Sequence, residues 1–376
     1  MPLLFRADDP KLDKPFCYFF INLLLIDIRT TLPTLLEKLN HPDYGELAAR
    51  MTSALDIVGC FVAYLVEGME GDDRGDEPPI LPPDLILKLR KGFCETMSIT
   101  IEYLRDRWDA AVAGAKGLHP DARVGAAETS MGSRLTLTWD SKTEGDIREG
   151  RPFISAVATV AFWIREDDNE ALRMEAAGLL DMWMDLYQNS PTTTTNFEYR
   201  GLVIFALEGI TASEEGIEAF LAHGGWATLS KDLISSFLAT ARLGDVSAAL
   251  RGIDVVQILL RIVEEETAGT REEWMQLVKA VGDWDCPNAE YLDQPPKVQA
   301  FQADVLGLAA ALFVNANDGM QRRFGRSASL IRVIAARLQV NQATQRAGGR
   351  YPPGVGGAYY DSFQDVIDTL EPFSKG

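Results

Sequence analysis

The sequence predicts an all-α fold, an armadillo/HEAT-like α-solenoid of stacked helical hairpins, and three observations lead to it. Apolar residues recur at helical spacing through nearly the whole chain. The stretch AFLAHGGWATLSKDL (Ala219 to Leu233) ends one apolar stripe, breaks at two glycines and begins another. Two segments, LRMEAAGLLDMWM (Leu172 to Met184) and LRGIDVVQILLRI (Leu250 to Ile262), resemble each other at a distance of about two repeats of ~40 residues.

The junction at Gly224 and Gly225 is typical of a hairpin between two helices. A glycine directly after a helix can adopt the left-handed conformation that satisfies the last carbonyl groups. His223 suits the negative end of the helix dipole. Because the link is so short, the second helix is expected to fold back on the first. An irregular bundle of ordinary amphipathic helices is the alternative.

Residues 1–113 are expected to form the first helical part of the solenoid. Their most apolar run, FCYFFINLLLIDI (Phe16 to Ile28), contains Asn22 and Asp27. It is shorter than the ~18 residues that indicate a membrane span, so we expect a buried helix. The expected helices are Pro15–Leu39 with a kink or break at Pro33, Pro42–Glu70, and Asp84–Ala113 with Asp84 as its N-cap.

Residues 114–150 are predicted to be a long loop or disordered insertion, because only RLTLTW (Arg134 to Trp139) has a regular pattern there. Residues 151–376 are expected to form regular armadillo-like repeats, with a Gly/Pro-rich excursion at 345–361. Asp168 is expected to cap a helix over Asn169–Gln188, and Ser213 to cap the helix that precedes the two glycines. Further helices are expected at 151–166, within 190–210, and at 226–242, 245–266, 271–281, 297–314, 327–340 and 362–370.

The chain is acidic. Its 376 residues carry a formal net charge of -19, and the sequence pI is about 4.6. Such a surface repels phosphate, which argues against broad nucleic-acid binding, and it disfavours anionic lipid unless a local basic patch makes a peripheral contact. The start has no signal-peptide pattern. The four cysteines, three of them in apolar helical stretches, are expected to be buried and reduced. We therefore expect a cytoplasmic protein without an integral membrane segment.

No catalytic constellation stands out. The histidines, His41, His119 and His223, lie beside prolines or at a helix end. Phosphate-loop, nucleophile-elbow and zinc-protease motifs do not occur. No Cys/His cluster has ligand spacing, so neither a metal nor a cofactor is predicted. The acidic run REDDNE (Arg165 to Glu170) is interpreted as solvated charge at a helix junction. The chain is therefore predicted not to be an enzyme, and an α/α enzyme is the less favoured alternative.

Two features are candidates for partner binding. The motif DWD places Trp284 between Asp283 and Asp285, an arrangement that can hold a cationic side chain; burial of Trp284 in the core is the favoured alternative. The segment MQRRFGRSASLIRVIAAR concentrates arginine against the acidic background. It can bind an acidic segment or a lipid headgroup, or it can form salt bridges to neighbouring helices. Its arginines are Arg322, Arg323, Arg326, Arg332 and Arg337.

Three long strings resemble the neurochondrin family, in its fungal form: FCYFFINLLLIDIRTTLPTLLEKLN, KLRKGFCETMSITIEYLRDRWDAAVAGAKGLHPDAR and FWIREDDNEALRMEAAGLLDMWMDLY. The resemblance implies an armadillo-like α-solenoid without known enzymatic activity. It also implies cytosolic proteins that act by binding others, including small GTPases and receptor tails. Members are usually longer before the first string, so the chain is expected to be the C-terminal part of a member or a short form. The family has no site motif, and no residue role is carried over.

The predicted function is therefore that of a non-enzymatic protein-protein interaction scaffold, in which a concave helical surface binds a helix or an extended, somewhat basic segment. A regulator or chaperone of a small GTPase or G-protein α subunit is the alternative. Acidic grooves would steer the encounter and make it salt-sensitive.

Overall fold

The computed structural model describes residues 16–36, 38, 41–70, 81–112, 150–190, 198–265, 271–286, 294–347 and 357–375. These residues are all-helical, with fourteen α-helices and two short 3₁₀ helices and without a strand. The chain divides into two compact units, Met1–Ala219 and Phe220–Gly376. The predicted insertion at 114–150 lies outside the described residues except for Gly150, and the helices before and after it belong to the first unit.

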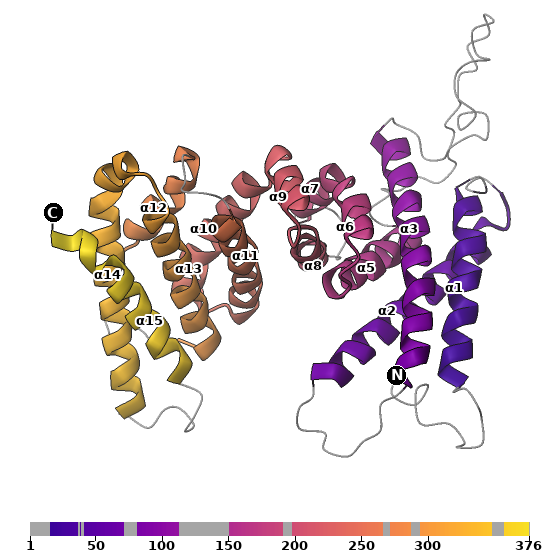
Figure 1. Ribbon diagram of the computed structural model, residues 1–376, viewed down its shortest axis with the longest axis horizontal. Coiled ribbons are helices and arrows are strands. Elements are labelled where there is room, and N and C mark those ends of the chain that lie inside the picture. The colour runs from indigo at the N-terminus through magenta and orange to yellow at the C-terminus, as the bar shows by residue number, and fades with distance from the viewer. Residues whose placement is uncertain are drawn as a thin grey trace, which may run out of the picture. The chain divides into compact units, whose positions relative to one another are not determined.

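The helices of the first unit follow the predicted order (Figure 1). They are α1 (Phe16–Leu35), α2 (Tyr44–Glu70), α3 (Pro83–Val112), α5 (Arg151–Glu166), α6 (Glu170–Ala177), α7 (Leu180–Asn189) and α8 (Arg200–Ile210), and α9 (Glu214–Ala222) crosses the boundary between the units. The second unit contains α10 (Gly225–Leu243), α11 (Val246–Glu265), η2 (Glu272–Trp274), α12 (Met275–Gly282), α13 (Pro296–Val314), α14 (Asp318–Ala347), α15 (Gly357–Leu370) and η4 (Glu371–Lys375).

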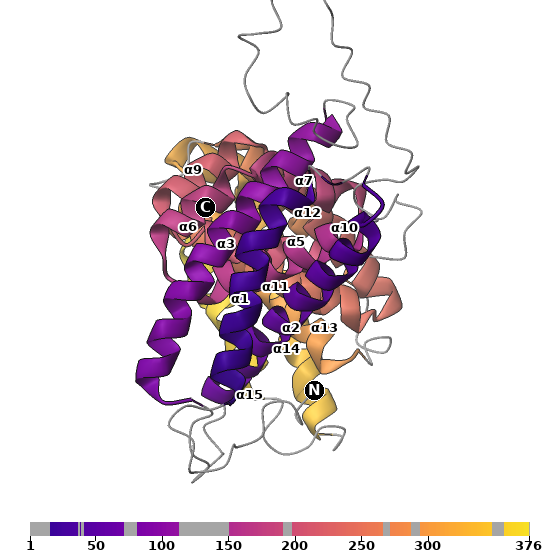
Figure 2. The same cartoon turned by 90° about the vertical axis from the view of Figure 1, so that its right-hand side faces the viewer.

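Helix α1 packs against α2 and α3, and both views show α1 and α3 side by side (Figures 1 and 2). Ile21, Leu25 and Ile28 are fully buried at helical spacing, which is the face that such periodicity places in a core. The opposite face exposes four large apolar side chains, Phe16, Phe19, Leu23 and Ile26. Pro33 lies inside the last turn of α1 without breaking it.

Helix α5 forms the centre of the first unit, where it packs against α2, α3 and α8. Phe153, Val157 and Ile164 are buried along it. Its contact with α8 is close because Gly209 faces Ile164. A Cβ at Gly209 would lie 2.3 Å from the Ile164 carbonyl oxygen. A larger residue at this position would push the two helices apart.

Helix α13 forms the centre of the second unit and packs against α10, α11, α12, α14 and α15. Val298, Phe301 and Leu308 are among its many buried residues. Gly252 on α11 allows the Phe301 ring to approach, because a Cβ there would meet the ring at 2.3 Å. Burial raises the pKa of Asp304, on the same helix, to about 6.

Most helix ends agree with the predicted signals. Ser213 caps α9, since its Oγ accepts a hydrogen bond from the Gly216 amide at 3.2 Å. Gly224 has a φ of 70° between α9 and α10, as expected for a glycine that follows a helix. The helix predicted over Asn169–Gln188 is instead two helices, α6 and α7, separated at Gly178 and Leu179. Its apparent counterpart at 250–262 lies within the continuous helix α11.

Three other expectations were wrong at the ends of helices. Asp84 lies in the first turn of α3, which begins at Pro83, and so does not precede the helix. Helix α14 begins at Asp318 rather than at Ser327, and it extends into the predicted excursion at 345–361. Of that excursion, only residues 348–356 lie outside the described residues. Helix α14 continues through Gly325, the glycine in QRRFGRS. The apolar residues Phe324 and Ala328 on either side of it are buried and hold the helix in place.

Three described helical segments are long and apolar enough to cross a membrane by length and composition: Phe16–Leu35, Tyr44–Val66 and Pro296–Val314. The apolar window of the third is 72% buried within the fold, against 39% for each of the other two. Its apolar character is therefore explained by its position at the centre of the second unit.

Neighbouring leucines on α1 test the assignment of its two faces. Leu25→Ala should lower the free energy of unfolding by about 2–5 kcal/mol, because it leaves a cavity in a closed core. Leu23→Ala should change it by less than about 0.5 kcal/mol, since Leu23 is 64% exposed. Urea denaturation followed by circular dichroism measures both, and equal losses would contradict the assignment.

The raised pKa of Asp304 predicts a pH dependence of stability. Between about pH 4 and pH 6 the folded chain keeps a proton that the unfolded chain releases, so the free energy of unfolding falls as pH rises through this window and stays lower above it. Asp304→Asn should therefore stabilise the protein more at about pH 8 than at about pH 4. Thermal unfolding at both pH values measures this, with the exposed Asp365→Asn as the control. A pH-independent effect at Asp304 would refute the prediction.

Candidate functional site

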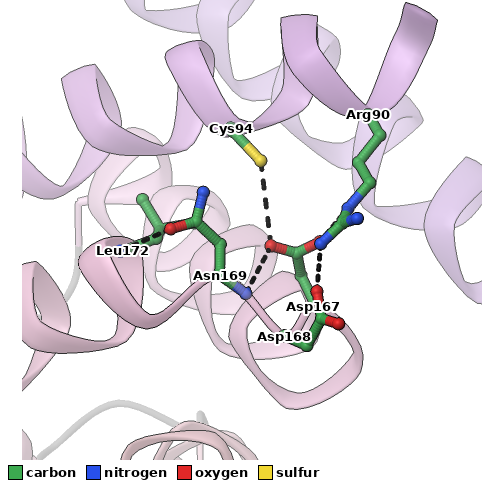
Figure 3. Close-up of polar contacts among 6 residues, drawn as sticks. All are labelled: Arg90, Cys94, Asp167, Asp168, Asn169 and Leu172. Carbon is green, nitrogen blue, oxygen red and sulfur yellow. Dashed lines mark hydrogen bonds and ion pairs between the residues drawn. The ribbon is translucent and has the colours of Figure 1, made fainter. Parts of the chain in front are cut away.

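The most organised polar cluster lies where the turn after α5 meets α3 (Figure 3). Arg90 on α3 donates from Nε to Asp167 Oδ1 at 2.6 Å, and its Nη2 forms an ion pair with Asp168. Cys94, one helical turn further along α3, donates from Sγ to Asp167 Oδ2 at 3.7 Å. One guanidinium thus binds two consecutive carboxylates, which fixes α3 to the α5–α6 turn.

The turn is held by its own backbone as well. Helix α5 ends at Glu166, and the Asp167 amide donates to the Trp163 carbonyl at 2.9 Å. The Asn169 amide donates to Asp167 Oδ2 at 3.2 Å. Asn169 Oδ1 accepts from the Leu172 amide at 3.2 Å, so Asn169 is the N-cap of α6. The expectation that Asp168 caps this helix was wrong, because the carboxylate of Asp168 pairs with Arg90 instead.

Burial sets the electrostatics of the cluster. The Asp167 side chain is only 6% exposed, so the ion pair with Arg90 replaces much of the water that a carboxylate otherwise needs. The hydrogen bond with Asp167 raises the pKa of Arg90 above its ordinary value. Burial, followed by the charge of Asp167, raises the pKa of the Cys94 thiol. The interpretation of REDDNE as solvated charge was therefore wrong for Asp167, and the raised pKa of Cys94 disfavours its thiolate, the nucleophilic form.

A pocket of about 330 Å³ opens beside this cluster. Its wall is apolar and is supplied by α2, α3 and α5 through Leu65, Val66, Ile86, Leu89, Phe93 and Trp163. Its rim is acidic, because Glu166, Asp167 and Asp168 line it together with Arg90. The pocket therefore combines an apolar interior with three carboxylates and one guanidinium.

Stacked aromatic rings support the pocket wall. The Phe93 ring lies between Phe61, at a centroid distance of 6.3 Å, and Trp163, at 4.5 Å, and both pairs are nearly parallel. Such stacking adds to the stabilisation that burial gives. The indole Nε1 of Trp163 is buried and has no hydrogen-bond partner among the described residues. A donor of this kind is costly unless an acceptor reaches it.

The comparisons with known proteins agree with the resemblance in the sequence. The family model described as Neurochondrin matches residues 3–281, which is more than half of the chain. The chain belongs to the neurochondrin family. An uncharacterized protein of Schizosaccharomyces pombe, C16C4.02c, is 22% identical over 235 residues, 61% of this chain. The chain spans 36% of the length of that relative. No solved structure matches the chain.

The candidate site of this neurochondrin-family chain is built from the strings that carry the resemblance. Arg90, Phe93 and Cys94 lie in KLRKGFCETMS, and the turn residues lie in FWIREDDNEALRM. The two strings meet in space at the ion pair between Arg90 and Asp167. Sequence reasoning missed this contact. The available signal was a basic stretch, Lys88 to Lys91, in the first half of α3 and an acidic pair directly after the apolar helix α5.

The DWD residues lie after α12 in the second unit. Trp284 is buried and packs edge-on against Phe237 at a centroid distance of 4.7 Å, as the favoured alternative expected. Asp283 and Asp285 are exposed on either side of it. The next residue, Cys286, accepts a hydrogen bond through its carbonyl from Arg337 Nη1 at 3.1 Å. The structure thus brings this loop to α14, although the Trp284 ring is not offered to solvent.

The predicted arginines all lie on α14 but differ in their surroundings. Arg323 forms an ion pair with Glu272, as expected for a salt bridge to a neighbouring element, and Arg332 is half-buried. Arg322 and Arg326 are exposed and make no ion pair with any other described residue. Leu330, Val333 and Val340 are exposed on the same helix.

The described residues contain no group of three or more His, Cys, Asp or Glu side chains that could hold a metal ion. His41 has a local structural contact, since its Nδ1 accepts from the Asp43 amide at 3.3 Å, whereas His119 lies outside the described residues.

Among the cysteines, Cys17 and Cys286 are buried, Cys94 is half-buried and Cys60 is exposed. The expectation that the cysteines are buried was therefore wrong for Cys60, which faces away from the core side of α2.

The thiols provide a chemical test of the cluster. Cys60 should react with iodoacetamide at about pH 8 at least roughly tenfold faster than Cys94, because the thiolate is the nucleophile and the raised pKa keeps Cys94 protonated. Peptide mass mapping over time measures both rates in one sample, with the buried Cys17 as an internal slow reference. A Cys94 that reacts as fast as Cys60 would show that the thiol does not lie against Asp167.

Proposed function

We propose that the chain is a non-enzymatic protein-protein interaction scaffold whose helices stack as an armadillo-like solenoid. Membership of the neurochondrin family supports a protein-interaction role, because this is not a known enzyme family. The packing supports stacking. In the first unit, α1 packs on α2, α2 on α5 and α5 on α8. In the second unit, α10 packs on α11, α11 on α13 and α13 on α14 and α15. Contacts between near neighbours in the chain are typical of solenoids.

The observation that carries the proposal is an exposed stripe on α14. Arg326, Leu330, Val333, Arg337 and Val340 recur at alternating steps of four and three residues, and all are exposed. This is the spacing at which one helix packs along another. Arg322, one turn before Arg326, extends the positive charge. We name these six residues the α14 stripe.

The partner that this stripe fits is an amphipathic helix with acidic residues beside its apolar seam. The guanidinium groups of Arg322 and Arg326 bind carboxylates well. An anionic membrane fits less well, because the net charge of -19 on the whole chain opposes its approach even where the stripe itself is basic. Asp283 and Asp285, beside the contact of Arg337 with Cys286, are exposed carboxylates that can also bind a basic side chain of the partner.

A cytoplasmic location belongs to the same proposal. Helix α1 carries Asp27 and Arg29 within its apolar length, and they form ion pairs with Arg50 on α2 and Glu95 on α3. Charges inside a bilayer are costly.

The family resemblance implies a small GTPase, a G-protein α subunit or a receptor tail as the partner. Nucleotide exchange and hydrolysis rates, measured with and without the chain, test the first two.

Site-specific photo-crosslinking tests the α14 stripe. With benzoylphenylalanine in place of Val333, we expect one protein adduct in cells. The double variant Arg322→Glu/Arg326→Glu should reduce its yield at least roughly tenfold, because two attractive contacts become repulsive. The double variant Lys231→Glu/Lys297→Glu makes the same change in net charge at exposed positions of the second unit and should leave the yield unchanged. Equal yields from both double variants, or adducts to lipid alone, would refute the stripe as a protein-binding surface.

A further inference from the structure

The pocket in the first unit restricts the chemistry of its occupant. Its volume of about 330 Å³ is that of a small-ligand site and exceeds the space needed for one aliphatic side chain. The wall is apolar, so the part of the occupant that enters must be apolar as well. The rim has three carboxylates and one guanidinium, which leaves an excess of negative charge at the opening.

Two of the three rim carboxylates can reach an occupant. Asp167 is buried against Arg90, whereas the side chains of Asp168 and Glu166 are 83% and 37% exposed. Glu166 also faces Arg165, at 3.6 Å, but Arg165 has a closer partner in Glu208, at 2.9 Å. A cation beside the opening can therefore bind Glu166 and Asp168. Each of these carboxylates has about four acceptor positions and uses few of them in its present ion pair.

A third feature is Trp163, whose ring lines the pocket. Its indole N–H lacks an acceptor among the described residues and is shielded from solvent, so an acceptor in the pocket reaches it only when the ring shifts. An occupant that supplies an acceptor removes the cost of this orphaned donor. A backbone carbonyl is such an acceptor, and it lies within a few ångströms of every side chain of a peptide. A long-chain amine offers an apolar part and a cation but no acceptor.

We propose that this pocket binds a short segment of a partner protein in which apolar side chains stand directly beside lysine or arginine. The apolar side chains enter between α2 and α3, and the basic side chain lies against Glu166 and Asp168. A backbone carbonyl accepts from the Trp163 indole after a small shift of the ring exposes its N–H. This inference rests on the proposed function as a protein-interaction scaffold. It concerns a different surface from the α14 stripe and requires a basic partner segment rather than an acidic one.

Fluorescence anisotropy with the full chain tests the chemistry of the occupant. Three labelled peptides are compared, with Arg-Leu-Leu-Lys, Glu-Leu-Leu-Glu or Arg-Ser-Ser-Lys at the centre of a common glycine-serine sequence. Only the first should bind, and its affinity should fall as salt is raised, because the rim charges are partly exposed. Dodecylammonium, tested as an unlabelled competitor, represents an amphiphilic cation without a carbonyl group.

Two kinds of variant test the location. Ile86→Trp fills the pocket and should weaken binding of the first peptide at least roughly tenfold, while Leu87→Trp, on the neighbouring residue that is 65% exposed, should leave it unchanged. Glu166→Lys/Asp168→Lys should abolish binding without altering an apolar wall. The control for charge is Glu46→Lys/Asp56→Lys, which makes the same change in net charge at two exposed positions of α2 outside the pocket lining. Circular dichroism checks that each variant is folded.

The outcomes separate this inference from the proposed function. No binding of the first peptide at about millimolar concentration, or binding that survives both Ile86→Trp and the charge reversal, would refute the pocket while leaving the α14 stripe intact. Tighter binding of dodecylammonium with no peptide bound would assign the pocket to a small amphiphilic cation and would also refute it. If Arg322→Glu/Arg326→Glu loses the crosslinked adduct at Val333 but still binds the first peptide, the two surfaces bind separate partner segments.

Discussion

The arrangement of the first unit around its pocket depends on the ion pair between Arg90 and Asp167. Asp167 is nearly inaccessible to water, and a buried carboxylate without a cation is strongly unfavourable. Arg90 lies on α3, while Asp167 lies in the turn between α5 and α6. The pair therefore holds together two segments that are far apart in the sequence. Burial at this junction, followed by the charge of Asp167, raises the pKa of the Cys94 thiol, and Glu166 and Asp168 line the pocket beside the pair.

Much of the fold could be predicted from local patterns, because helices depend on apolar spacing and on capping residues. Ser213 and Gly224 were assigned their roles correctly from the sequence alone. The failures have a common physical cause, which is tertiary packing. Asp168 seemed a suitable cap from its position, but Arg90 from another helix binds it and leaves the cap to Asn169. Helix α14 continues through Gly325 because buried side chains on both sides hold it.

The candidate site was harder to predict than the fold. The acidic run at 165–170 looks solvated in the sequence because nothing nearby in the chain shows that Arg90 will meet it. The opposite error was avoided at Trp284, where an aromatic between acids suggested a binding group and the core proved the better explanation. The sequence does not show which arginines of α14 form structural contacts. This becomes clear only from the structure, in which α12 packs against α14 and Arg323 pairs with Glu272 of η2. Charge patterns thus indicate where contacts form, while packing decides which contacts they are.

A double-mutant cycle on Arg90 and Asp167 tests most directly whether this ion pair organises the first unit. The free energy of unfolding is measured for Arg90→Ala, for Asp167→Ala and for the double variant. If the two side chains pair as described, their effects are coupled by at least about 1 kcal/mol, since the second substitution removes a group that has already lost its partner. Effects that add within about 0.5 kcal/mol would contradict the pairing, and with it the architecture of the pocket.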